Sequence, residues 1–246
     1  MRNIRLTIAY DGTDFCGWQV QKNGRTVQET IEKALEKLHK HPVFLHGAGR
    51  TDSGVHATGQ TASFISDAEN IPPGKFNLAL NSILPKDVRI TGSGEVHPSF
   101  HARFSAVART YHYYLYPSGV RHPVLRNYCW QVKRQFNLPL LNDYAARLVG
   151  QHDFTAFSGP RNEDKSPFRN IHAASFFPMN GFTVFSITGN AFLWKMVRSI
   201  IGTLLELEYK KAGPDRVREI IESGNRALAG STAPATGLYL HKVSYT

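Results

Sequence analysis

The chain has 246 residues, of which 41% are hydrophobic, and it carries a formal charge of +10 from 29 Lys and Arg against 19 Asp and Glu. This length and composition suit one large folded domain or two modest ones and exclude an intrinsically disordered chain. Its two cysteines, Cys16 and Cys129, are too few for a disulfide-dense secreted scaffold or for a structural zinc site alone. The alternating N-terminal sequence and the lack of any long apolar run predict no signal peptide and no membrane span, and a cytoplasmic location fits best.

The positive charge favours a polyanionic partner, because phosphates bound by Lys and Arg release their counterions. Nucleic acid is the leading class of partner, with an ordinary basic surface as the alternative. The sequence contains no Walker-type phosphate loop, no dinucleotide-binding glycine motif and no His-Glu-x-x-His motif. These absences exclude the corresponding nucleotide hydrolases, dinucleotide oxidoreductases and zinc proteases. The histidines are scattered without the spacing of ligand pairs, so no metal site is expected.

The first half of the chain predicts the order strand, helix, strand, strand, helix, strand. Ile4, Leu6 and Ile8 alternate with polar or small residues, which is typical of a strand with one buried face. Thr26 and Glu29 form a capping-box pattern that predicts the start of an amphipathic helix. The remaining elements are expected as strands at 43–48 and 60–65, a proline-led helix with its apolar stripe at 76–84, and a strand at 88–91.

The second half predicts a similar mixture of strands and helices. Asn180-Gly181 is the strongest short signal for a hairpin turn, here between strands at 171–177 and 182–188. A very apolar stripe at 192–205 predicts a helix that is buried on most sides. The other elements are expected as strands at 111–116, 128–132 and 238–245, a helix at 141–148 that stops at Gly150, and a helix led by Pro214.

Both halves approximate the split strand-helix-strand arrangement of ferredoxin-like units. The fold class expected is therefore α/β (α+β), with two ferredoxin-like halves that share one mixed, largely antiparallel sheet. The seam is placed near Ser105, which gives domains at 1–105 and 106–246. The polar stretch at 162–167 is expected to be an exposed loop.

The most unusual segment is Gly49-Arg-Thr-Asp-Ser-Gly-Val-His-Ala, which joins two predicted strands. It places the carboxylate of Asp52 between glycines and close in sequence to Arg50 and His56. A carboxylate beside cations stays ionised, which suits a nucleophile or an electrostatic stabiliser better than a proton donor. The alternative is a turn in which Asp52 only caps backbone amides.

Two further features stand out in the second half. The strand at 111–116 places Tyr111, Tyr113 and Leu115 on one face, and aromatic strands either pack in the core or, when exposed, stack on bases. Arg198, with Lys195, interrupts the apolar helix, and a charge beside a buried face needs a partner. The alternative is that Arg198 extends to solvent from the edge of the helix.

The segment at 49–57 resembles the signature of the tRNA pseudouridine synthase A family, the TruA-like enzymes. Further blocks resemble that family in the same order along nearly the whole chain. They are Tyr10-Asp-Gly-Thr-Asp-Phe-Cys-Gly-Trp-Gln-Val-Gln, Thr26-Val-Gln-Glu, Asn81-Ser-Ile-Leu-Pro, Phe100-His-Ala-Arg-Phe-Ser-Ala, Arg109-Thr-Tyr-His-Tyr, Met196-Val-Arg and Gly237-Leu-Tyr-Leu.

The resemblance implies isomerisation of uridine to pseudouridine at positions 38, 39 and 40, in the anticodon stem-loop of tRNA. It also implies a pseudouridine synthase fold, a homodimer, and no metal or organic cofactor. By motif, Asp52 matches the catalytic aspartate and Arg198 the arginine that pairs with it. Tyr111 matches the active-site tyrosine that stacks on the uracil and is a candidate base. RNA binding is assigned to Arg50 and Tyr111 and, in addition, to Arg25, His56 and Arg103.

The sequence departs from the family pattern at Ser53, where alanine is commoner, and at Trp194-Lys195, before Met196. Ser53 adds a hydroxyl that can form hydrogen bonds near Asp52, and Lys195 leaves open what the usual residue does there. Two alternatives to the expected function remain: a noncatalytic tRNA-binding chaperone, and a synthase that acts on other positions or other RNAs. The chemical route of Asp52 also stays open among attack on the sugar, attack on the base and removal of a sugar proton.

Overall fold

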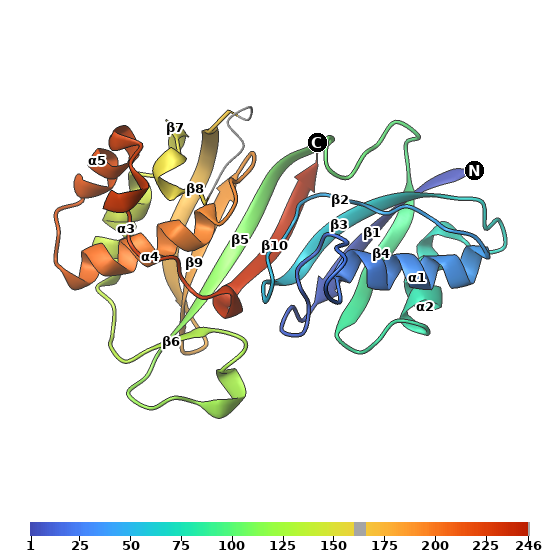
Figure 1. Ribbon diagram of the computed structural model, residues 1–246, viewed down its shortest axis with the longest axis horizontal. Coiled ribbons are helices and arrows are strands. Elements are labelled where there is room, and N and C mark those ends of the chain that lie inside the picture. The colour runs from blue at the N-terminus through green and yellow to red at the C-terminus, as the bar shows by residue number, and fades with distance from the viewer. Residues whose placement is uncertain (160–165, 246) are drawn as a thin grey trace. The chain divides into compact units, whose positions relative to one another are not determined.

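The computed structural model describes residues 1–159 and 166–245 and divides into two compact units (Figure 1). The first unit comprises residues 1–107 and 239–246, and the second comprises residues 108–238. The sequence-based division at Ser105 lies close to the first of these boundaries. The grouping differs for the last strand, which packs with the first unit.

The first unit contains a sheet of mixed direction. Its strands are β1 (Arg2–Tyr10), β2 (His46–Gly47), β3 (His56–Ser66), β4 (Val88–Val96) and β10 (Leu238–Tyr245). They follow the order β4-β1-β3-β10, with β2 paired to β3. The β1 pairings with β3 and β4 and the β2–β3 pairing are antiparallel, whereas β10 runs parallel to β3, with Tyr239 opposite His56.

Two helices, α1 (Val27–His39) and α2 (Phe76–Asn81), cover the same face of this sheet (Figure 1). They meet the sheet at Phe64, whose ring centroid lies 5.8 Å from that of His39 and 5.5 Å from that of Phe76. Ile4, Leu6 and Ile8 of β1 lie on that face and are fully buried, as the period-two alternation predicts. The opposite face of the sheet carries the alternate residues of β1, such as the exposed Arg5.

The second unit has a sheet in the order β5-β9-β8-β7, with β6 parallel to β5. Its strands are β5 (Ala106–Pro117), β6 (Trp130–Val132), β7 (Gly150–Asp153), β8 (Phe168–Met179) and β9 (Phe182–Gly189). Its helices are α3 (Leu138–Ala146), α4 (Met196–Tyr209) and α5 (Arg216–Ser223). Helix α3 packs on β8 and on α4.

The mixed α/β class and the prevalence of antiparallel pairing within each unit confirm the sequence-based expectation. The hairpin turn at Asn180-Gly181 is also confirmed, since both residues adopt positive φ, 49° and 83°. The joining of the two halves into one shared sheet stays a prediction.

Several predicted boundaries were wrong. The apolar helix begins at Met196 and not at residue 192, because Lys195 takes the left-handed conformation with φ 60°. The strand expected at 43–48 narrows to His46–Gly47, and the strand at 88–91 extends to Val96. The proline-led helix ends at Asn81, before the last two residues of its expected stripe.

The capping box at the start of α1 was also wrong in its chemistry. Thr26 is the N-cap, but its side chain makes no capping hydrogen bond. Its buried hydroxyl has no hydrogen-bond partner among the described residues. Glu29 forms an ion pair with Lys33 at 2.6 Å in place of the expected capping contact.

The exposed loop expected at 162–167 lies largely outside the described residues. Among the helices of the described ranges, none is both long enough and apolar enough to cross a membrane.

Candidate active site

The connection from β2 to β3 carries Asp52 and begins by running back along β3. The backbone N–H of Ala48 donates to the carbonyl of Thr61 at 2.8 Å, and the Gln60 amide donates to the carbonyl of Gly49 at 2.8 Å. Gln60 is fully buried, so this bond satisfies a polar side chain of β3 while it fixes the start of the loop.

A tight turn then presents Asp52. The N–H of Val55 donates to the carbonyl of Asp52 at 3.2 Å, and Gly54 adopts φ 76°, a conformation that favours glycine. Thr51 is buried, and its hydroxyl is hydrogen bonded to the Tyr10 hydroxyl at 2.8 Å. Asp52 itself is half-buried. The residue before the carboxylate is thus anchored in the core, while Asp52 lies at the edge of it.

A second loop, at 11–18, packs its backbone against the Asp52 turn. A Cβ atom on Gly12 would lie 2.0 Å from the carbonyl oxygen of Val55. Gly17 has φ 100°, and a Cβ there would lie 2.6 Å from the carbonyl oxygen of Thr51. Both glycines are required for this close approach. Both glycines lie in the block from Tyr10 to Gln21 that resembles the family, but the sequence analysis gave neither of them a structural role.

His56 and Arg50 flank the turn in different ways. His56 is 1% exposed, its Nδ1 accepts the Gly12 N–H at 3.0 Å, and its ring stacks on Tyr239 at 4.6 Å. Because Nδ1 accepts this bond, its 3.2 Å approach to the Asp11 carboxylate is not a second hydrogen bond. These contacts describe a buried residue that positions the turn, so direct RNA contact by His56 gains no support. Arg50 is exposed.

The two other basic residues assigned to RNA lie elsewhere on the first unit. Arg25 makes a bidentate ion pair with Asp87, at 2.5 and 2.9 Å, and its guanidinium lies 4.1 Å from the Phe15 ring centroid. It also lines a hollow of about 580 Å³ together with Lys22, Lys33 and Lys37. Arg103 is exposed on the turn before β5. Phosphate contact by either residue stays a prediction.

Tyr111 belongs to the second unit, where it lies on β5 opposite Ile187 of β9. It shares the buried face of the strand with Tyr113 and Leu115, as the alternation predicts, and it retains 8% exposure. Its ring packs edge-to-face on Phe192 with a centroid distance of 5.1 Å. This packing fixes the plane of the Tyr111 ring.

Arg198 lies in the first turn of α4 and is half-buried. A cation is disfavoured at this end of a helix, because the helix dipole is positive there. The structure compensates through Ala233, whose carbonyl accepts the Arg198 Nε–H at 2.8 Å. In return, the Ala233 N–H donates to the carbonyl of Arg198 at 3.0 Å.

The same segment holds a second polar side chain. The hydroxyl of Tyr113, on β5, donates to the carbonyl of Pro234 at 2.8 Å. Burial raises the pKa of Tyr113, and the nearby charge of Arg198 partly opposes this rise. Tyr113 is therefore a neutral donor next to the arginine. Sequence reasoning missed the Ala233-Pro234 segment, since it carries no charged or aromatic side chain.

The two departures from the family pattern have local explanations. The Ser53 hydroxyl donates to the carbonyl of Phe15 at 3.2 Å, so it ties the Asp52 turn to the 11–18 loop. Lys195 is the N-cap of α4, and its ammonium lies 4.5 Å from the Trp194 ring centroid. Lys195 thus precedes the helix and does not interrupt it.

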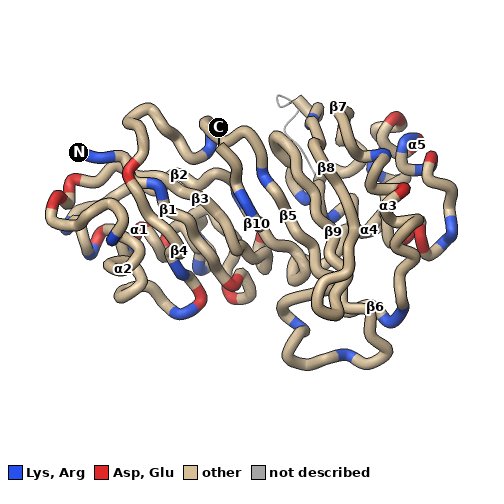
Figure 2. Tube along the Cα trace, turned by 180° about the vertical axis from the view of Figure 1, so that it is seen from behind, with Lys and Arg blue, Asp and Glu red and all other residues tan. Residues whose placement is uncertain are grey.

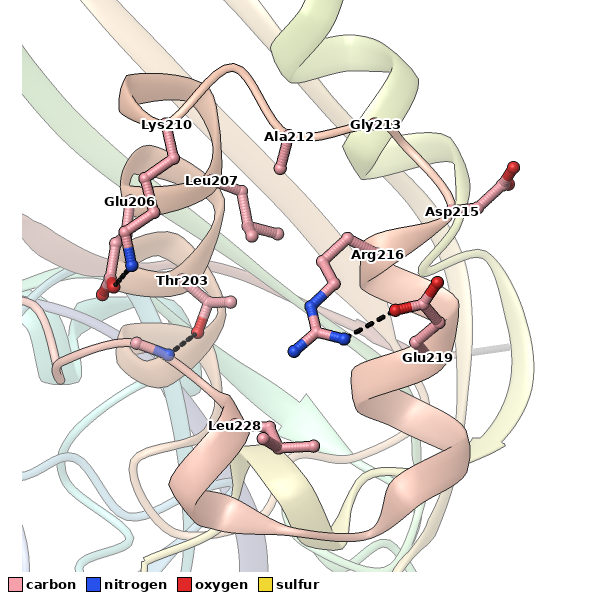
Figure 3. Close-up of a pocket in the computed structure, with 11 residues that line it drawn as sticks. Thr203, Glu206, Leu207, Lys210, Ala212, Gly213, Asp215, Arg216, Glu219 and Leu228 are labelled. Carbon is pink, nitrogen blue, oxygen red and sulfur yellow. Dashed lines mark hydrogen bonds and ion pairs between the residues drawn. The ribbon is translucent and has the colours of Figure 1, made fainter.

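A hollow of about 400 Å³ in the second unit contains none of these residues (Figure 3). Lys210–Glu206 and Arg216–Glu219 ion pairs, each at 2.6 Å, line it and largely neutralise its charge. Within the described ranges, no group of three or more His, Cys, Asp or Glu side chains is placed to hold a metal ion.

Asp52, Arg50 and His56 therefore lie together in the first unit, and Tyr111 and Arg198 lie in the second. The joining of these residues into one site stays a prediction.

The chain matches the family model described as tRNA pseudouridine synthase over residues 6–105 and 144–246. It is 47% identical over 249 residues to the tRNA pseudouridine synthase A of Treponema denticola, with 99% of this chain and 93% of the relative covered. The relative of that name from Acetivibrio thermocellus is 44% identical over 245 residues, covering both chains completely. The one from Brachyspira hyodysenteriae is 42% identical, with 100% and 99% covered.

A solved Cbf5-Nop10-Gar1 complex is also similar, with a TM-score of 0.37 and 8% identity over 82% of this chain and 44% of that one. This likeness is too weak to support an argument. The family model and the full-length relatives are sufficient by themselves: the chain belongs to the tRNA pseudouridine synthase family.

Proposed function

We propose that this protein isomerises uridine to pseudouridine in tRNA. The observation that supports the proposal most strongly is the full-length similarity to tRNA pseudouridine synthases A. The Asp52 turn adds local support, because Thr51, Gly12 and Gly17 fix its backbone. A carboxylate on a rigid support suits chemistry at one defined atom of a substrate.

The reaction breaks the bond between N1 of uracil and C1′ of the ribose and forms a bond from C5 to C1′. The proton at C5 is lost and N1 gains a proton, so the reaction is redox-neutral and the chemistry requires no electron carrier. The target base lies in an RNA stem and must leave the stack before a side chain can reach its sugar.

We assign the catalytic carboxylate to Asp52, which acts by attack on the sugar, attack on the base or removal of a sugar proton. Tyr111 stacks on the flipped uracil and replaces the stacking that the base loses. Arg198 pairs with Asp52 and keeps it ionised and oriented. Arg50, exposed beside the turn, holds the flipped nucleotide or its phosphate.

The finer proposals are that the target positions are 38, 39 and 40 of the anticodon stem-loop, and that the enzyme acts as a cytoplasmic homodimer. Carbodiimide primer-extension mapping of unmodified tRNA incubated with the protein tests the activity and the positions together. New stops at 38 to 40 are expected. A noncatalytic chaperone leaves no new stop, and a synthase of different specificity leaves stops elsewhere.

A further inference from the structure

The first unit contains a stack of three rings, none of which belongs to a residue assigned to catalysis. The ring centroid of His101 lies 4.8 Å from that of His46 and 4.4 Å from that of Phe104. The interplanar angles are 34° and 36°, so the rings overlap as tilted plates. The Arg103 guanidinium lies 5.7 Å from the Phe104 ring centroid. We call His46, His101 and Phe104 the ring stack.

The turn that carries His101 and Phe104 is fixed on the helix-free face of the first sheet, which holds these two rings in place next to His46 on β2. Asn3 donates its side-chain N–H to the carbonyl of Phe100 at 2.7 Å. The Ala102 N–H donates to the Ser63 hydroxyl at 3.1 Å, and the Ala102 carbonyl accepts the Tyr245 hydroxyl at 2.7 Å. Three strands, β1, β3 and β10, thus hold one short turn.

The middle ring is fixed from within the turn. His101 Nδ1 accepts the N–H of Arg103 at 3.1 Å and that of Phe104 at 3.4 Å. A nitrogen that accepts hydrogen bonds carries no proton, so the imidazole is neutral in this arrangement. Burial and the neighbouring His46 also lower the pKa of His101. The middle of the stack is therefore an uncharged ring at neutral pH.

The outer ring is open to solvent. Phe104 is 77% exposed, and Phe44, two residues before His46 on the extended segment that leads into β2, is also 77% exposed. An isolated exposed phenylalanine is ordinary, whereas a series of overlapping rings that ends in a largely exposed ring fits a planar ligand. Nucleobases are such ligands, and stacking on aromatic side chains is a common way to bind unpaired ones.

The charge of the turn that carries His101 and Phe104 favours RNA over an aromatic side chain of a protein partner. The turn at 97–105 carries Arg103 and no Asp or Glu. The chain stays free of Asp and Glu from there to Asp143, and in the second unit Figure 2 shows blue segments and no red ones on the loop from β5 to β6. A base comes with phosphates on both sides, and an acid-free segment does not repel them.

We propose that the ring stack binds an unpaired base of the RNA substrate by stacking on Phe104, at a point separate from the Asp52 turn. The stack attaches to β3 at Ser63, whereas the Asp52 loop joins β3 at His56. Ser63 and His56 are seven residues apart, roughly 20 Å along the strand at about 3.3 Å per residue, while the start of the loop that carries Asp52 lies beside Thr61. The base proposed to bind the ring stack is a different nucleotide from the one that is isomerised. The inference rests on the proposed function for the identity of the RNA.

The test is the affinity of Phe104→Ala for two RNAs: a tRNA anticodon stem-loop and a blunt duplex with the same stem but no unpaired bases. Loss of a base stack weakens binding of the stem-loop by about tenfold, within a range of roughly 5- to 150-fold. Affinity for the duplex is expected to stay unchanged. The matched control is Leu78→Ala, which removes apolar surface from a 60% exposed residue on the helix-covered side of the same unit.

Phe104→Trp is the rescue variant, because it keeps a planar ring in place. It is expected to bind the stem-loop as tightly as the wild type, and its added indole fluorescence is expected to be quenched by the stem-loop but not by the duplex. Equal affinity of the wild type and Phe104→Ala for the stem-loop overturns the proposal and leaves a protein partner as the occupant. An equal loss for both RNAs also overturns it.

The same samples separate this inference from the proposed function. If the wild type forms no pseudouridine in the stem-loop while Phe104→Ala still loses affinity for it, the proposed function fails and the ring stack stands as an RNA site. If pseudouridine forms and the affinities are equal, the ring-stack proposal fails and the proposed function stands.

Discussion

Arg198 and Ala233 hold each other through two hydrogen bonds of opposite direction. The Arg198 Nε–H donates to the Ala233 carbonyl at 2.8 Å, and the Ala233 N–H donates to the Arg198 carbonyl at 3.0 Å. The first of these bonds uses one nitrogen of the guanidinium, Nε, and fixes the plane of the guanidinium. An end-on bidentate carboxylate contact uses the two terminal nitrogens and is compatible with this Nε bond.

The first prediction concerns this fixed guanidinium. Arg198→Lys keeps the charge but loses the planar fork and the Nε–H, so it is expected to retain more activity than Arg198→Ala and far less than the wild type. Tritium release from tRNA labelled at C5 of uridine measures the rate. Equal rates for Arg198→Lys and the wild type would show that charge alone matters and would contradict the role assigned to the fork.

The second prediction is that Asp52→Asn abolishes isomerisation while tRNA binding survives. The substitution removes the charge and the nucleophilicity of the side chain with little change in volume, and a loss of roughly 10³-fold or more, about 4 kcal/mol of barrier, is expected. Asp67→Asn is the control, because Asp67 is an exposed carboxylate of the same unit that pairs with His41 at 2.8 Å. Turnover of Asp52→Asn within tenfold of the wild type would remove Asp52 from the mechanism.

The third prediction separates stacking from hydroxyl chemistry at Tyr111. Tyr111→Phe keeps the ring, which Phe192 holds at 5.1 Å, and is expected to bind tRNA normally but to turn over much more slowly. Tyr116→Phe, on the other face of the same strand, is the control. If Tyr111→Phe turns over normally and Tyr111→Ala does not, only the stacking role remains.

Sequence patterns predicted correctly those elements that are determined by residues close together in the sequence. The alternation at Ile4, Leu6 and Ile8 and the turn at Asn180-Gly181 depend on neighbouring residues alone, and both predictions hold. The predicted start of α4 was wrong. The apolar stripe extends back to Phe192, but Lys195 adopts the left-handed conformation, so the helix begins only after it. A periodic pattern cannot reveal a single backbone conformation of this kind.

Nonlocal pairing explains the other gaps. Strand β10 pairs in parallel with β3, with Tyr239 opposite His56. The sequence of neither strand alone specifies the other as its pairing partner. The sequence singled out Asp52 because a carboxylate among cations and glycines is rare. It gave no role to Gly12 or Gly17, since a requirement for close backbone approach becomes visible only when the opposing Val55 and Thr51 carbonyls are located.

The fourth prediction is that tRNA affinity falls steeply with salt, because contacts between phosphates and a protein of charge +10 release condensed counterions. Filter binding from about 50 to 200 mM salt is expected to show a loss of roughly tenfold or more, as the linear dependence on the logarithm of salt requires. An affinity that stays flat across this interval would contradict docking through phosphate contacts.

The last prediction concerns stability and runs against the usual rule for helix N-caps, by which loss of a capping threonine costs about 1 kcal/mol. The Thr26 hydroxyl is fully buried, makes no capping bond and has no partner among the described residues. Its carbonyl still accepts the Thr30 N–H at 3.1 Å, and this bond does not depend on the side chain. A buried hydroxyl without a partner costs roughly 1 to 3 kcal/mol, so its removal at constant shape should not destabilise the fold.

Thr26→Val is therefore expected to leave the free energy of unfolding unchanged or to raise it by about 1 kcal/mol. The extended backbone at this position, φ −126° and ψ 153°, suits a β-branched residue. Thr26→Ser, which keeps the hydroxyl and removes the methyl group, is the matched control and should lower stability by roughly 1 kcal/mol. Urea denaturation measures the free energy of unfolding of both variants. The slope of that free energy against urea concentration is expected to stay unchanged. A Thr26→Val protein that is less stable than Thr26→Ser would mean that the hydroxyl does cap α1 in solution.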